Sequence, residues 1–421
     1  MSCAPSEFLA LYFAELDRRG IPNVVLHSYE ALPDHVASDV DYAVPEEHRE
    51  SLLGIQKELA AQHGWVVAQV LRHQVFAAYH VLVQRDDPRV TLKLDACSHY
   101  VKDRCLFIHD SKLLDGRRPL RCFHIPAPAV EFAYVLAKVV GKNKDATRYF
   151  PRLENLFSVD PGGAQAEFER LAGKDAGKFP DWLKRGEDDW AALNRGVREL
   201  HAYNAGLLAR EFGRIAKRVL RPTGLWVSYL GVDGAGKSTQ IENFAARECF
   251  RNVRVFHFRP MVFEQRREAV TVTDPHGQPP RSVAASWLKM LYYFADFWLG
   301  WLVVILPACM RSTCVIFDRG FDDILLDQRR YRLKGVAALA RVLRIFVPKP
   351  HVVIALDVSA ETARARTPEL APEEIERQRS VLRVLCAGAT SHHLISAEPH
   401  AETVATEAGK IIVAELASRL R

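Results

Sequence analysis

The chain has 421 residues, of which 48% are hydrophobic and 26% charged, and its formal net charge at pH 7 is +6. This composition is typical of a soluble globular protein and excludes a largely disordered chain, and the length predicts two or three domains. Apart from the stretch 210–221, which is expected to be a solvated helix face, the basic residues are dispersed and form no concentrated face with interleaved aromatic side chains, so we expect no nucleic-acid partner.

The eight cysteines form no Cys-x-x-Cys pair and show no metal-ligand spacing. Free thiols of this kind are typical of a reducing compartment. The opening stretch MSCAPSEFLALYFAELDRRG carries acidic side chains and lacks a basic leader before an apolar core, which predicts an ordinary helix and no secretory signal. We therefore expect a cytoplasmic protein without a zinc site.

Residues 1–160 predict an α+β domain. After the first helix come two short apolar runs, at 23–27 and 39–44, and a polar helix that follows Pro45. Three further strands are expected at 65–73, 75–84 and 89–97. Because these strands follow one another through short turns, they favour a mixed or antiparallel sheet.

Acidic side chains lie on the predicted strands of this domain. In DVDYAV, Asp39 and Asp41 share one face, because strand side chains alternate with a period of two. Asp95, in VTLKLDAC, falls on the polar face of its own strand. Neighbouring carboxylates repel each other unless a cation lies between them, so these three predict a two-metal site for nucleotidyl transfer. Solvated acids on an exposed strand are the alternative.

This arrangement resembles the nucleotidyltransferase superfamily, in which a Gly-Ser turn precedes an Asp-x-Asp strand and a third aspartate comes from a later strand. Ser28, Asp39, Asp41 and Asp95 follow that order, although His27 replaces the glycine. The resemblance implies a nucleotidyltransferase-like fold and a second site at these residues. The basic segment 138–150 supplies cations for a phosphate, or is simply a solvated helix end.

Residues 161–222 predict a helical appendage and connector, since Gly/Pro-rich ends enclose helical spacing. Residues 223–421 then alternate apolar strands with helical segments, which is typical of a parallel sheet with helices on both faces. The expected strands are 225–230, 253–258, 313–318, 351–358 and 392–397. An amphipathic helix over 401–420 closes this α/β domain.

The stretch from Gly231 to Ser238, in YLGVDGAGKSTQ, matches the P-loop pattern G-x-x-x-x-G-K-[ST]. An apolar strand precedes it and helical spacing follows over 238–250, so backbone N–H groups converge on a triphosphate. Lys237 is expected to neutralise the β- and γ-phosphates, and the Ser238 hydroxyl to ligate Mg²⁺. The expected ATP-binding residues are Gly231, Gly234, Ala235, Gly236, Lys237, Ser238 and Thr239.

A P-loop site also needs a carboxylate at the end of a neighbouring strand, and TCVIFDRGFDD places Asp318 there. We expect Asp318 and Ser238 to hold the metal. Arg319 follows directly, where a guanidinium can stabilise the transferred phosphoryl group or bind an acceptor phosphate. Lys237, Asp318 and Arg319 are therefore the expected catalytic residues, with a surface salt bridge as the alternative role of Arg319.

Together, GVDGAGKST, FADF before an apolar helix, VIFDRG, IALDVSAETARAR and EIERQR resemble the thymidylate kinase-like family of P-loop kinases, over about residues 225–421. The resemblance implies phosphoryl transfer with ATP and Mg²⁺ as cofactors. It implies that Asp233, Arg259 and Arg319 bind the acceptor. It also implies that Arg364 and Arg366 belong to a lid that closes over the transferred group.

The chain departs from that family in its substrate loop. The stretch FHFRPMVFEQRREAV lacks the Glu-Pro-Gly-Gly sequence of thymidylate kinases, and Phe297 replaces the arginine of their Ala-Asp-Arg motif. An insertion, TVTDPHGQPPRSVAASW, follows. These departures favour an acceptor other than thymidylate, such as another nucleotide, a sugar or a sugar phosphate.

We therefore expect an ATP-dependent phosphotransferase that acts on a small molecule. Two alternatives stay open: a nucleotidyltransferase with a regulatory P-loop domain, and an ATP-binding switch without catalysis. The uncharged run 297–310 is shorter than the roughly 18 residues of a membrane span and predicts a buried helix. A peripheral membrane contact or a partner at 287–306, and a homodimer, are further alternatives.

Overall fold

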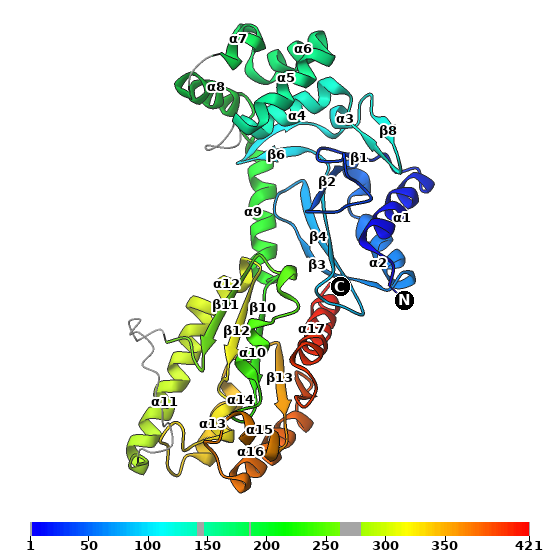
Figure 1. Ribbon diagram of the computed structural model, residues 1–421. Helices are drawn as coiled ribbons and strands as arrows, with labels where there is room; N and C mark the ends of the chain where they lie inside the picture. Colours follow the sequence, from blue (N-terminus) through cyan, green and yellow to red (C-terminus); the bar gives the residue numbers. More distant parts are fainter. Residues whose placement is uncertain (1, 141–146, 185–186, 262–278, 421) are drawn as a thin grey trace. The chain divides into compact units, whose positions relative to one another are not determined.

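The computed structural model describes residues 2–140, 147–184, 187–261 and 279–420. Contacts divide the chain into two units (Figure 1). Unit 1 comprises residues 1–85 and 90–217, and unit 2 comprises residues 86–89 and 218–421. Each unit has a central sheet and its own apolar core, and each is described separately.

Unit 1 contains a five-stranded sheet in the order β1-β2-β5-β4-β3. The strands are β1 (Val24–Val25), β2 (Val40–Ala43), β3 (Trp65–Leu71), β4 (Ala77–Gln84) and β5 (Thr91–Cys97). The pair β2 and β5 is parallel, and the other neighbouring pairs are antiparallel. The sheet is therefore mixed, as the short turns in the sequence predict.

Helix α1 (Pro5–Arg18) packs beside this sheet through aromatic side chains, and α2 (Leu52–Gln62) lies against β3. Tyr12 of α1 and Tyr42 of β2 share a buried hydrogen bond of 2.6 Å. The smaller elements of the unit are β6 (Tyr100–Lys102), β7 (Cys105–Ile108), α3 (Asp110–Leu113), β8 (Arg118–Leu120) and β9 (Phe123–Ile125).

The helices expected as a separate connector contribute instead to the core of unit 1. The helices from α4 onward are α4 (Pro128–Val140), α5 (Phe150–Val159), α6 (Pro161–Ala172), α7 (Phe179–Leu183) and α8 (Glu187–Leu200). Phe132 of α4, Phe168 of α6 and Phe179 of α7 lie in one buried cluster with strand residues. Their large apolar side chains need a common core, which explains why residues 161–200 join unit 1. Helix α9 (Ala205–Leu220) then leads into unit 2.

Unit 2 contains an all-parallel sheet in the order β11-β12-β10-β13-β14. The strands are β10 (Leu225–Leu230), β11 (Asn252–His257), β12 (Thr313–Asp318), β13 (Val352–Asp357) and β14 (His392–Ser396). Each bound lies within one residue of its predicted position. Strands buried on both faces read as continuous apolar runs, which makes their limits visible in the sequence.

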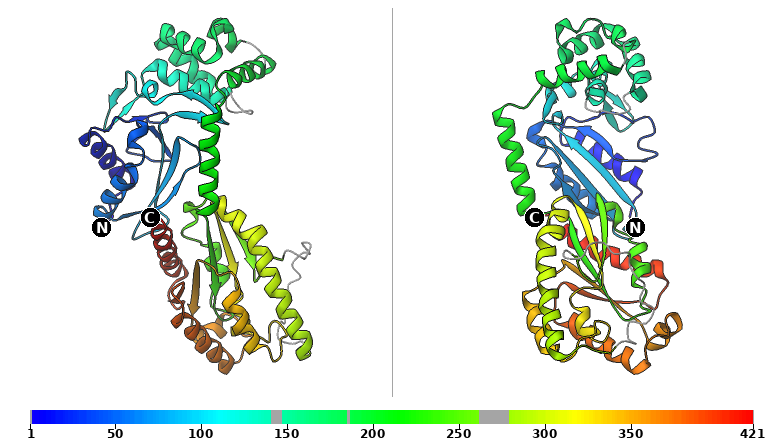
Figure 2. Two further views of the ribbon diagram at one scale, coloured as in Figure 1. Left: turned by 180° about the vertical axis from the view of Figure 1, so that it is seen from behind. Right: turned by 90° about the vertical axis from the view of Figure 1, so that its left-hand side faces the viewer.

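Helices cover both faces of this sheet, and Figure 2 shows the sheet between α17 (red) and α11 (yellow-green). The helices are α10 (Lys237–Glu242), α11 (Val283–Gly300), α12 (Leu306–Met310), α13 (Asp323–Leu326), α14 (Ala337–Phe346), α15 (Ala360–Arg366), α16 (Pro372–Ala387) and α17 (Ala401–Ser418). This arrangement is the predicted P-loop architecture.

The helix expected over 238–250 is shorter than predicted. Helix α10 ends at Glu242, and Asn243 leaves the helical conformation. The next three residues, 244–246, are all buried, so the chain turns into the core before a short 3₁₀ turn at Arg247–Cys249. Burial of these apolar side chains overrides the helical spacing of the sequence.

The apolar helix is longer than predicted and is only partly buried. With the π-helical turn Trp301–Ile305, helices α11 and α12 form one continuous helix, Val283–Met310, which in the described part of the chain is long and apolar enough to cross a membrane. Its inner side packs Met290, Tyr293 and Phe297 into the core beneath β12. Its outer side exposes Trp287, Leu288, Leu291, Trp298, Leu302 and Val303.

Candidate active site

The P-loop and Asp318 meet at one edge of the unit 2 sheet. Strand β10 ends at Leu230, directly before Gly231, and its Tyr229 is in register with Asp318 at the end of β12. Because parallel strands have their carboxyl ends at the same edge, the loop after β10 and the acid after β12 become neighbours. This edge is the place where α/β sheets commonly bind ligands.

Several glycines of the P-loop have a backbone conformation or surroundings that exclude a side chain. Gly234 has φ +83°, and a Cβ there would lie 2.4 Å from the Ala363 carbonyl oxygen of α15. Gly236, with φ +88°, is the left-handed residue that precedes α10. Ser238 and Thr239 are exposed in the first turn of α10, where their hydroxyl groups can reach a ligand.

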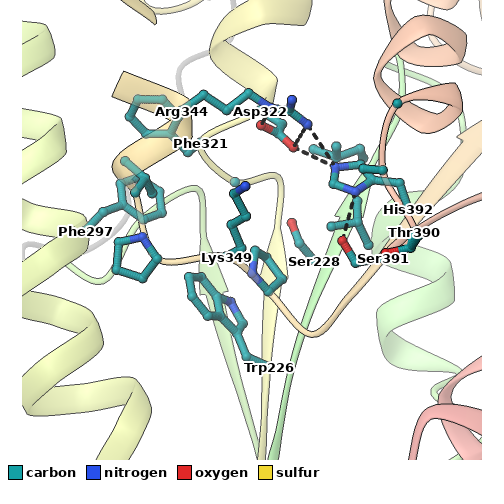
Figure 3. A pocket seen from close by; sticks show the side chains of 18 residues that line it. Trp226, Ser228, Phe297, Phe321, Asp322, Arg344, Lys349, Thr390, Ser391 and His392 are labelled. Atoms are coloured by element: carbon teal, nitrogen blue, oxygen red, sulfur yellow. Dashed lines mark hydrogen bonds and ion pairs between the residues drawn. The ribbon is translucent and has the colours of Figure 1, made fainter. Parts of the chain in front are cut away.

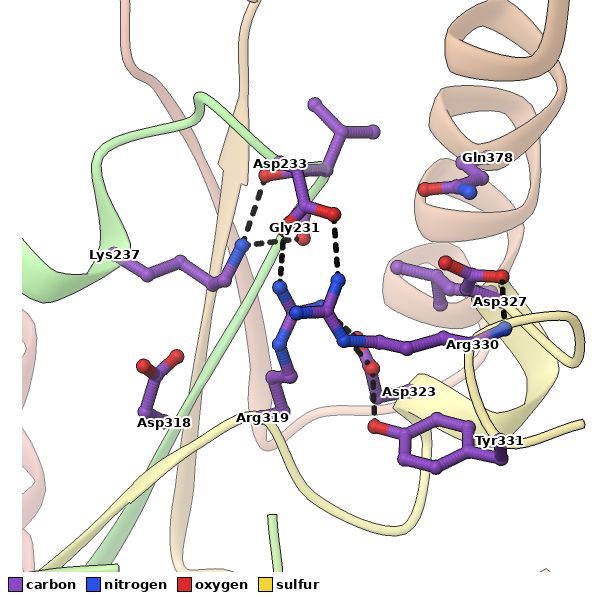
Figure 4. A network of polar contacts seen from close by, with 12 residues as sticks. Gly231, Asp233, Lys237, Asp318, Arg319, Asp323, Asp327, Arg330, Tyr331 and Gln378 are labelled. Atoms are coloured by element: carbon purple, nitrogen blue, oxygen red, sulfur yellow. Dashed lines mark hydrogen bonds and ion pairs between the residues drawn. The ribbon is translucent and has the colours of Figure 1, made fainter. Parts of the chain in front are cut away.

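Lys237 is buried, and its ammonium group donates hydrogen bonds within the P-loop itself (Figure 4). The Nζ atom lies 2.9 Å from the carbonyl oxygen of Gly231 and 2.8 Å from that of Val232. Burial, together with the nearby Arg319 guanidinium, lowers the pKa of Lys237 to about 8. A phosphate group offers this lysine a stronger partner than two carbonyl oxygens do.

Asp318 has the features of a metal ligand. Its Oδ1 atom is buried without a hydrogen-bond partner in the described part of the chain, and His257 Nδ1 lies 3.5 Å from its Oδ2. Burial alone raises the pKa of Asp318, but His257, Lys237 and Arg319 outweigh burial and hold the pKa below its usual value. An ionised carboxylate and the Ser238 hydroxyl are oxygen donors of the kind that Mg²⁺ prefers, so the residues present fit this metal.

Arg319 lies at the centre of a buried ion-pair network (Figure 4). Its guanidinium group donates to Asp233 of the P-loop and, at 3.2 Å, to Oδ2 of Asp323. Burial alone lowers the pKa of Arg319, but Asp323 and Asp233 outweigh burial and raise it. Arg319 therefore stays charged and its position is fixed from two sides.

A second guanidinium group reaches the same P-loop acid. Arg330 Nη1 lies 2.6 Å from Asp233 Oδ2, and Tyr331 donates a hydrogen bond of 2.6 Å to Asp323. Burial alone raises the pKa of Asp233, but Arg319, Lys237 and Arg330 lower it well below its usual range. Arg330, Asp323 and Tyr331 were not predicted as site residues, and their signal in the sequence is the charged run that follows VIFDRG.

The three other arginines expected at the kinase site, Arg259, Arg364 and Arg366, differ in burial and in their contacts. Arg259 is buried, and its Nη1 atom lies 2.9 Å from Oδ2 of Asp296 on α11. Arg366 lies beside the P-loop, where its Nη1 atom donates to the Gly234 carbonyl oxygen at 3.3 Å. Arg364 is exposed on the same helix, α15. The unmatched stretch that follows the second strand lies largely outside the described residues, at 262–278.

The structure also brings together the three acids of unit 1. Asp39, Asp41 and Asp95 each offer a carboxylate oxygen within 4.8 Å of the others, and Asp41 is in register with Asp95 across β2 and β5. Burial and the two neighbouring carboxylates raise the pKa of Asp95 to about 8. Its Oδ1 atom has no hydrogen-bond partner among the described residues.

Two further side chains contact Asp41 in this cluster. His27 forms a hydrogen bond with Asp41 Oδ2, and Lys138 Nζ lies 3.4 Å from the same oxygen. Ser28 has φ 55°, and its hydroxyl lies 2.8 Å from Nδ1 of His27. Of the basic segment 138–150, residues 141–146 lie outside the described residues.

Comparison with known proteins gives a family, several relatives and a solved structure that match part of the chain. Residues 231–405 match the family model described as thymidylate kinase. The thymidylate kinases of Xanthomonas campestris pv. campestris (strain B100) and Xanthomonas euvesicatoria pv. vesicatoria (strain 85-10) are each 30% identical over 213 residues, covering 48% of this chain and 88% of the relative. The crystal structure of thymidylate kinase from Ehrlichia chaffeensis aligns with 44% of this chain and 97% of its own, with 18% identity and a TM-score of 0.31.

Proposed function

The chain belongs to the thymidylate kinase family of P-loop kinases, and on that premise we propose that it transfers the γ-phosphoryl group of ATP to a small phosphorylated acceptor. The observation that carries the proposal is the grouping of Lys237, Asp318 and Arg319 at one edge of the sheet. Positioning and electrostatic stabilisation supply most of the catalysis in phosphoryl transfer, and these three residues provide both.

Each residue has a distinct part in this reaction. The P-loop N–H groups and Lys237 bind the triphosphate, and Lys237 exchanges its two carbonyl partners for phosphate oxygens. Asp318 and Ser238 would hold Mg²⁺, which when bound would neutralise charge on the β- and γ-phosphates. Arg319 stabilises the negative charge that develops on the transferred group. Arg366, beside Gly234, is the lid residue best placed to close over that group.

The pair of guanidinium groups at Asp233 favours an acceptor that already carries a phosphate. Arg319 and Arg330 both contact this one carboxylate, and Asp323 is a second partner of Arg319, so two guanidinium groups lie together at the P-loop. Guanidinium groups bind phosphate through paired hydrogen bonds. Among the acceptor classes left by the sequence, this pair of guanidinium groups favours a nucleoside monophosphate or a sugar phosphate over a neutral sugar.

A phosphate-transfer screen with γ-labelled and α-labelled ATP tests the proposal. The acceptors are thymidylate, other nucleoside monophosphates, simple sugars and sugar phosphates, each with Mg²⁺. We expect label from the γ position on a phosphorylated acceptor, and its loss in Lys237→Ala but not in Lys410→Ala, which removes an exposed lysine from the same unit. Tight ATP binding without transfer to any acceptor contradicts the proposal and favours a non-catalytic switch.

Nucleotidyl transfer in unit 1 is the second candidate, supported by the cluster of Asp39, Asp41 and Asp95. The buried, unpartnered oxygen of Asp95 fits a divalent cation. Because Lys138 already lies beside Asp41, one cation fits these acids better than two. Transfer of the α label, and binding of Mn²⁺ detected by paramagnetic resonance, should both be lost in the double variant Asp39→Asn, Asp41→Asn. Unchanged Mn²⁺ binding contradicts the metal site.

We further propose a cytoplasmic homodimer formed through the exposed side of α11 and α14. Leu288 and Leu291 of α11, and Ile345 and Phe346 of α14, are large apolar side chains that are 49–71% exposed. Surfaces of this kind mark contacts with a protein or a membrane. Sedimentation analysis should give a dimer for the wild type and a monomer for Leu288→Glu with Ile345→Glu. A wild-type monomer that binds anionic vesicles contradicts the dimer and favours a peripheral membrane contact.

A further inference from the structure

A cavity of 390 Å³ lies in unit 2 on the face of the sheet that α11, α14 and α16 cover (Figure 3). Its walls come from β10, from residues 320–322 after Arg319, from 347–350 before β13 and from 388–392 before β14. Its volume is within the range of small-molecule sites, about 300–1,000 Å³. The kinase mechanism does not use this cavity.

The cavity has an apolar side and a charged side. Trp226, Phe297 and Phe321 form the apolar part of its lining. On the charged side, Asp322 accepts a hydrogen bond of 2.6 Å from Arg344 Nε and lies 2.8 Å from His392 Nε2.

A second cation faces the same space. Figure 3 shows the Lys349 ammonium group directed between the aromatic side chains and the Asp322 cluster. In the described part of the chain, Lys349 forms no ion pair, whereas Asp322 is already paired with Arg344. The lining therefore carries excess positive charge beside an apolar wall, which suits an organic anion with a flat apolar body.

Part of the cavity wall is formed by residues that hold Arg319 in position. Ser228 lines the cavity, and its hydroxyl group donates to the backbone carbonyl oxygen of Arg319 at 3.2 Å. Asp322 faces the cavity, whereas the adjacent Asp323 accepts from the Arg319 guanidinium group. Arg319 has φ 75°, a conformation that a non-glycine residue keeps only when its surroundings hold it. Asp322, which lines the cavity, is thus the direct neighbour in sequence of a partner of Arg319.

We propose that this cavity is a regulatory site for a small organic anion, and that its occupation slows phosphoryl transfer by displacing Arg319. The anion pairs with Lys349 and competes with Asp322 for Arg344, so the segment 320–323 shifts and Arg319 loses its fixed position. The regulatory part rests on the proposed kinase function, whereas the binding part does not.

Calorimetric titration of the full chain with naphthalene-1-acetate tests the binding part, with the neutral naphthalene-1-acetamide as its matched control. We expect the acetate to bind at least tenfold more tightly than the acetamide. Lys349→Glu and the milder Lys349→Gln should weaken acetate binding, and Lys410→Glu, on an exposed site of the same unit, should not. The proposed site is wrong if the acetate does not bind. It is also wrong if the acetate and the acetamide bind equally and the Lys349 variants bind the acetate as tightly as the wild type does.

The γ-label assay tests the regulatory part. Saturating naphthalene-1-acetate should lower kcat at least threefold in the wild type and leave kcat unchanged in Lys349→Gln. If naphthalene-1-acetate binds but kcat does not change, the proposed regulation is wrong, although the cavity is still an anion-binding site. If the wild type transfers no γ label, the kinase function fails, and the calorimetric result still decides whether the cavity binds anions.

Discussion

Two glycines of the P-loop share an unusual backbone conformation but differ in their surroundings. Gly234 and Gly236 have φ values of +83° and +88°. A Cβ at Gly234 would lie 2.4 Å from a backbone oxygen of α15, whereas at Gly236 the nearest atom is a side-chain nitrogen of Arg366, 3.9 Å away. At Gly236 only the backbone conformation requires glycine. At Gly234 the neighbouring backbone of α15 also leaves no room for a Cβ atom.

We expect Gly234→Ala to destabilise unit 2 more than Gly236→Ala does. Left-handed backbone costs an alanine about 1–2 kcal/mol at either position, and only Gly234→Ala adds an overlap with backbone that cannot rotate away. The measurement is thermal unfolding without nucleotide, so that phosphate contacts do not enter. Equal losses of stability in the two variants would show that α15 moves aside freely.

At the scale of elements, one buried histidine links a strand to a helix in unit 1. His80 of β4 is 3% exposed, and its Nδ1 atom lies 2.5 Å from the Gln56 side-chain oxygen on α2. Gln56 in turn donates to the Tyr12 hydroxyl on α1. Burial, together with the charge of Arg72, lowers the pKa of His80 to about 4. The histidine is therefore neutral in the folded protein at any pH above that value.

This histidine should make unit 1 sensitive to acid. The pKa of an unfolded histidine is about 6.5, so between pH 6.5 and pH 4 the unfolded state binds more protons and stability falls as the pH falls. We expect the free energy of unfolding to drop by about 2 kcal/mol between pH 7 and pH 5 from this group alone. His80→Asn keeps a donor for Gln56 and cannot titrate there. Denaturant unfolding should show a smaller decrease in the free energy of unfolding between pH 7 and pH 5 for His80→Asn than for the wild type. Equal decreases in the two proteins would refute the assignment to His80.

The kinase half illustrates how far sequence reasoning reaches. Its strands and its P-loop were predictable because buried parallel strands and phosphate loops are local patterns. Asp318 was found because it ends such a strand. In contrast, Arg330 reaches Asp233 across 97 positions of the sequence, and only tertiary folding brings them together. The early end of α10 has the same origin, since burial of residues 244–246 overrode the local helical signal.

The acids of unit 1 were predictable as a group but not in their surroundings. Alternation along DVDYAV placed Asp39, which directly precedes β2, on one face with Asp41, and the register with β5 adds Asp95. No local sequence pattern places Lys138 against Asp41, because this contact depends on how α4 packs on the sheet. That lysine is the reason why we propose a site for one cation in place of the expected two-metal site.

At the scale of the whole molecule, each unit has its own buried core, which predicts two separate unfolding transitions in calorimetry. A non-hydrolysable ATP analogue with Mg²⁺ should stabilise only the unit that binds it, by about 2.7 kcal/mol at a hundredfold excess over Kd. We expect the transition that Gly234→Ala lowers to be the one that the analogue raises, because both belong to unit 2.

Lys237→Ala should abolish this shift, while the transition that depends on His80 stays at the same temperature with and without the analogue. If the analogue shifts only the His80-dependent transition, the triphosphate binds in unit 1, at Asp39, Asp41 and Asp95. Nucleotidyl transfer would then be the better supported hypothesis for the function of this chain.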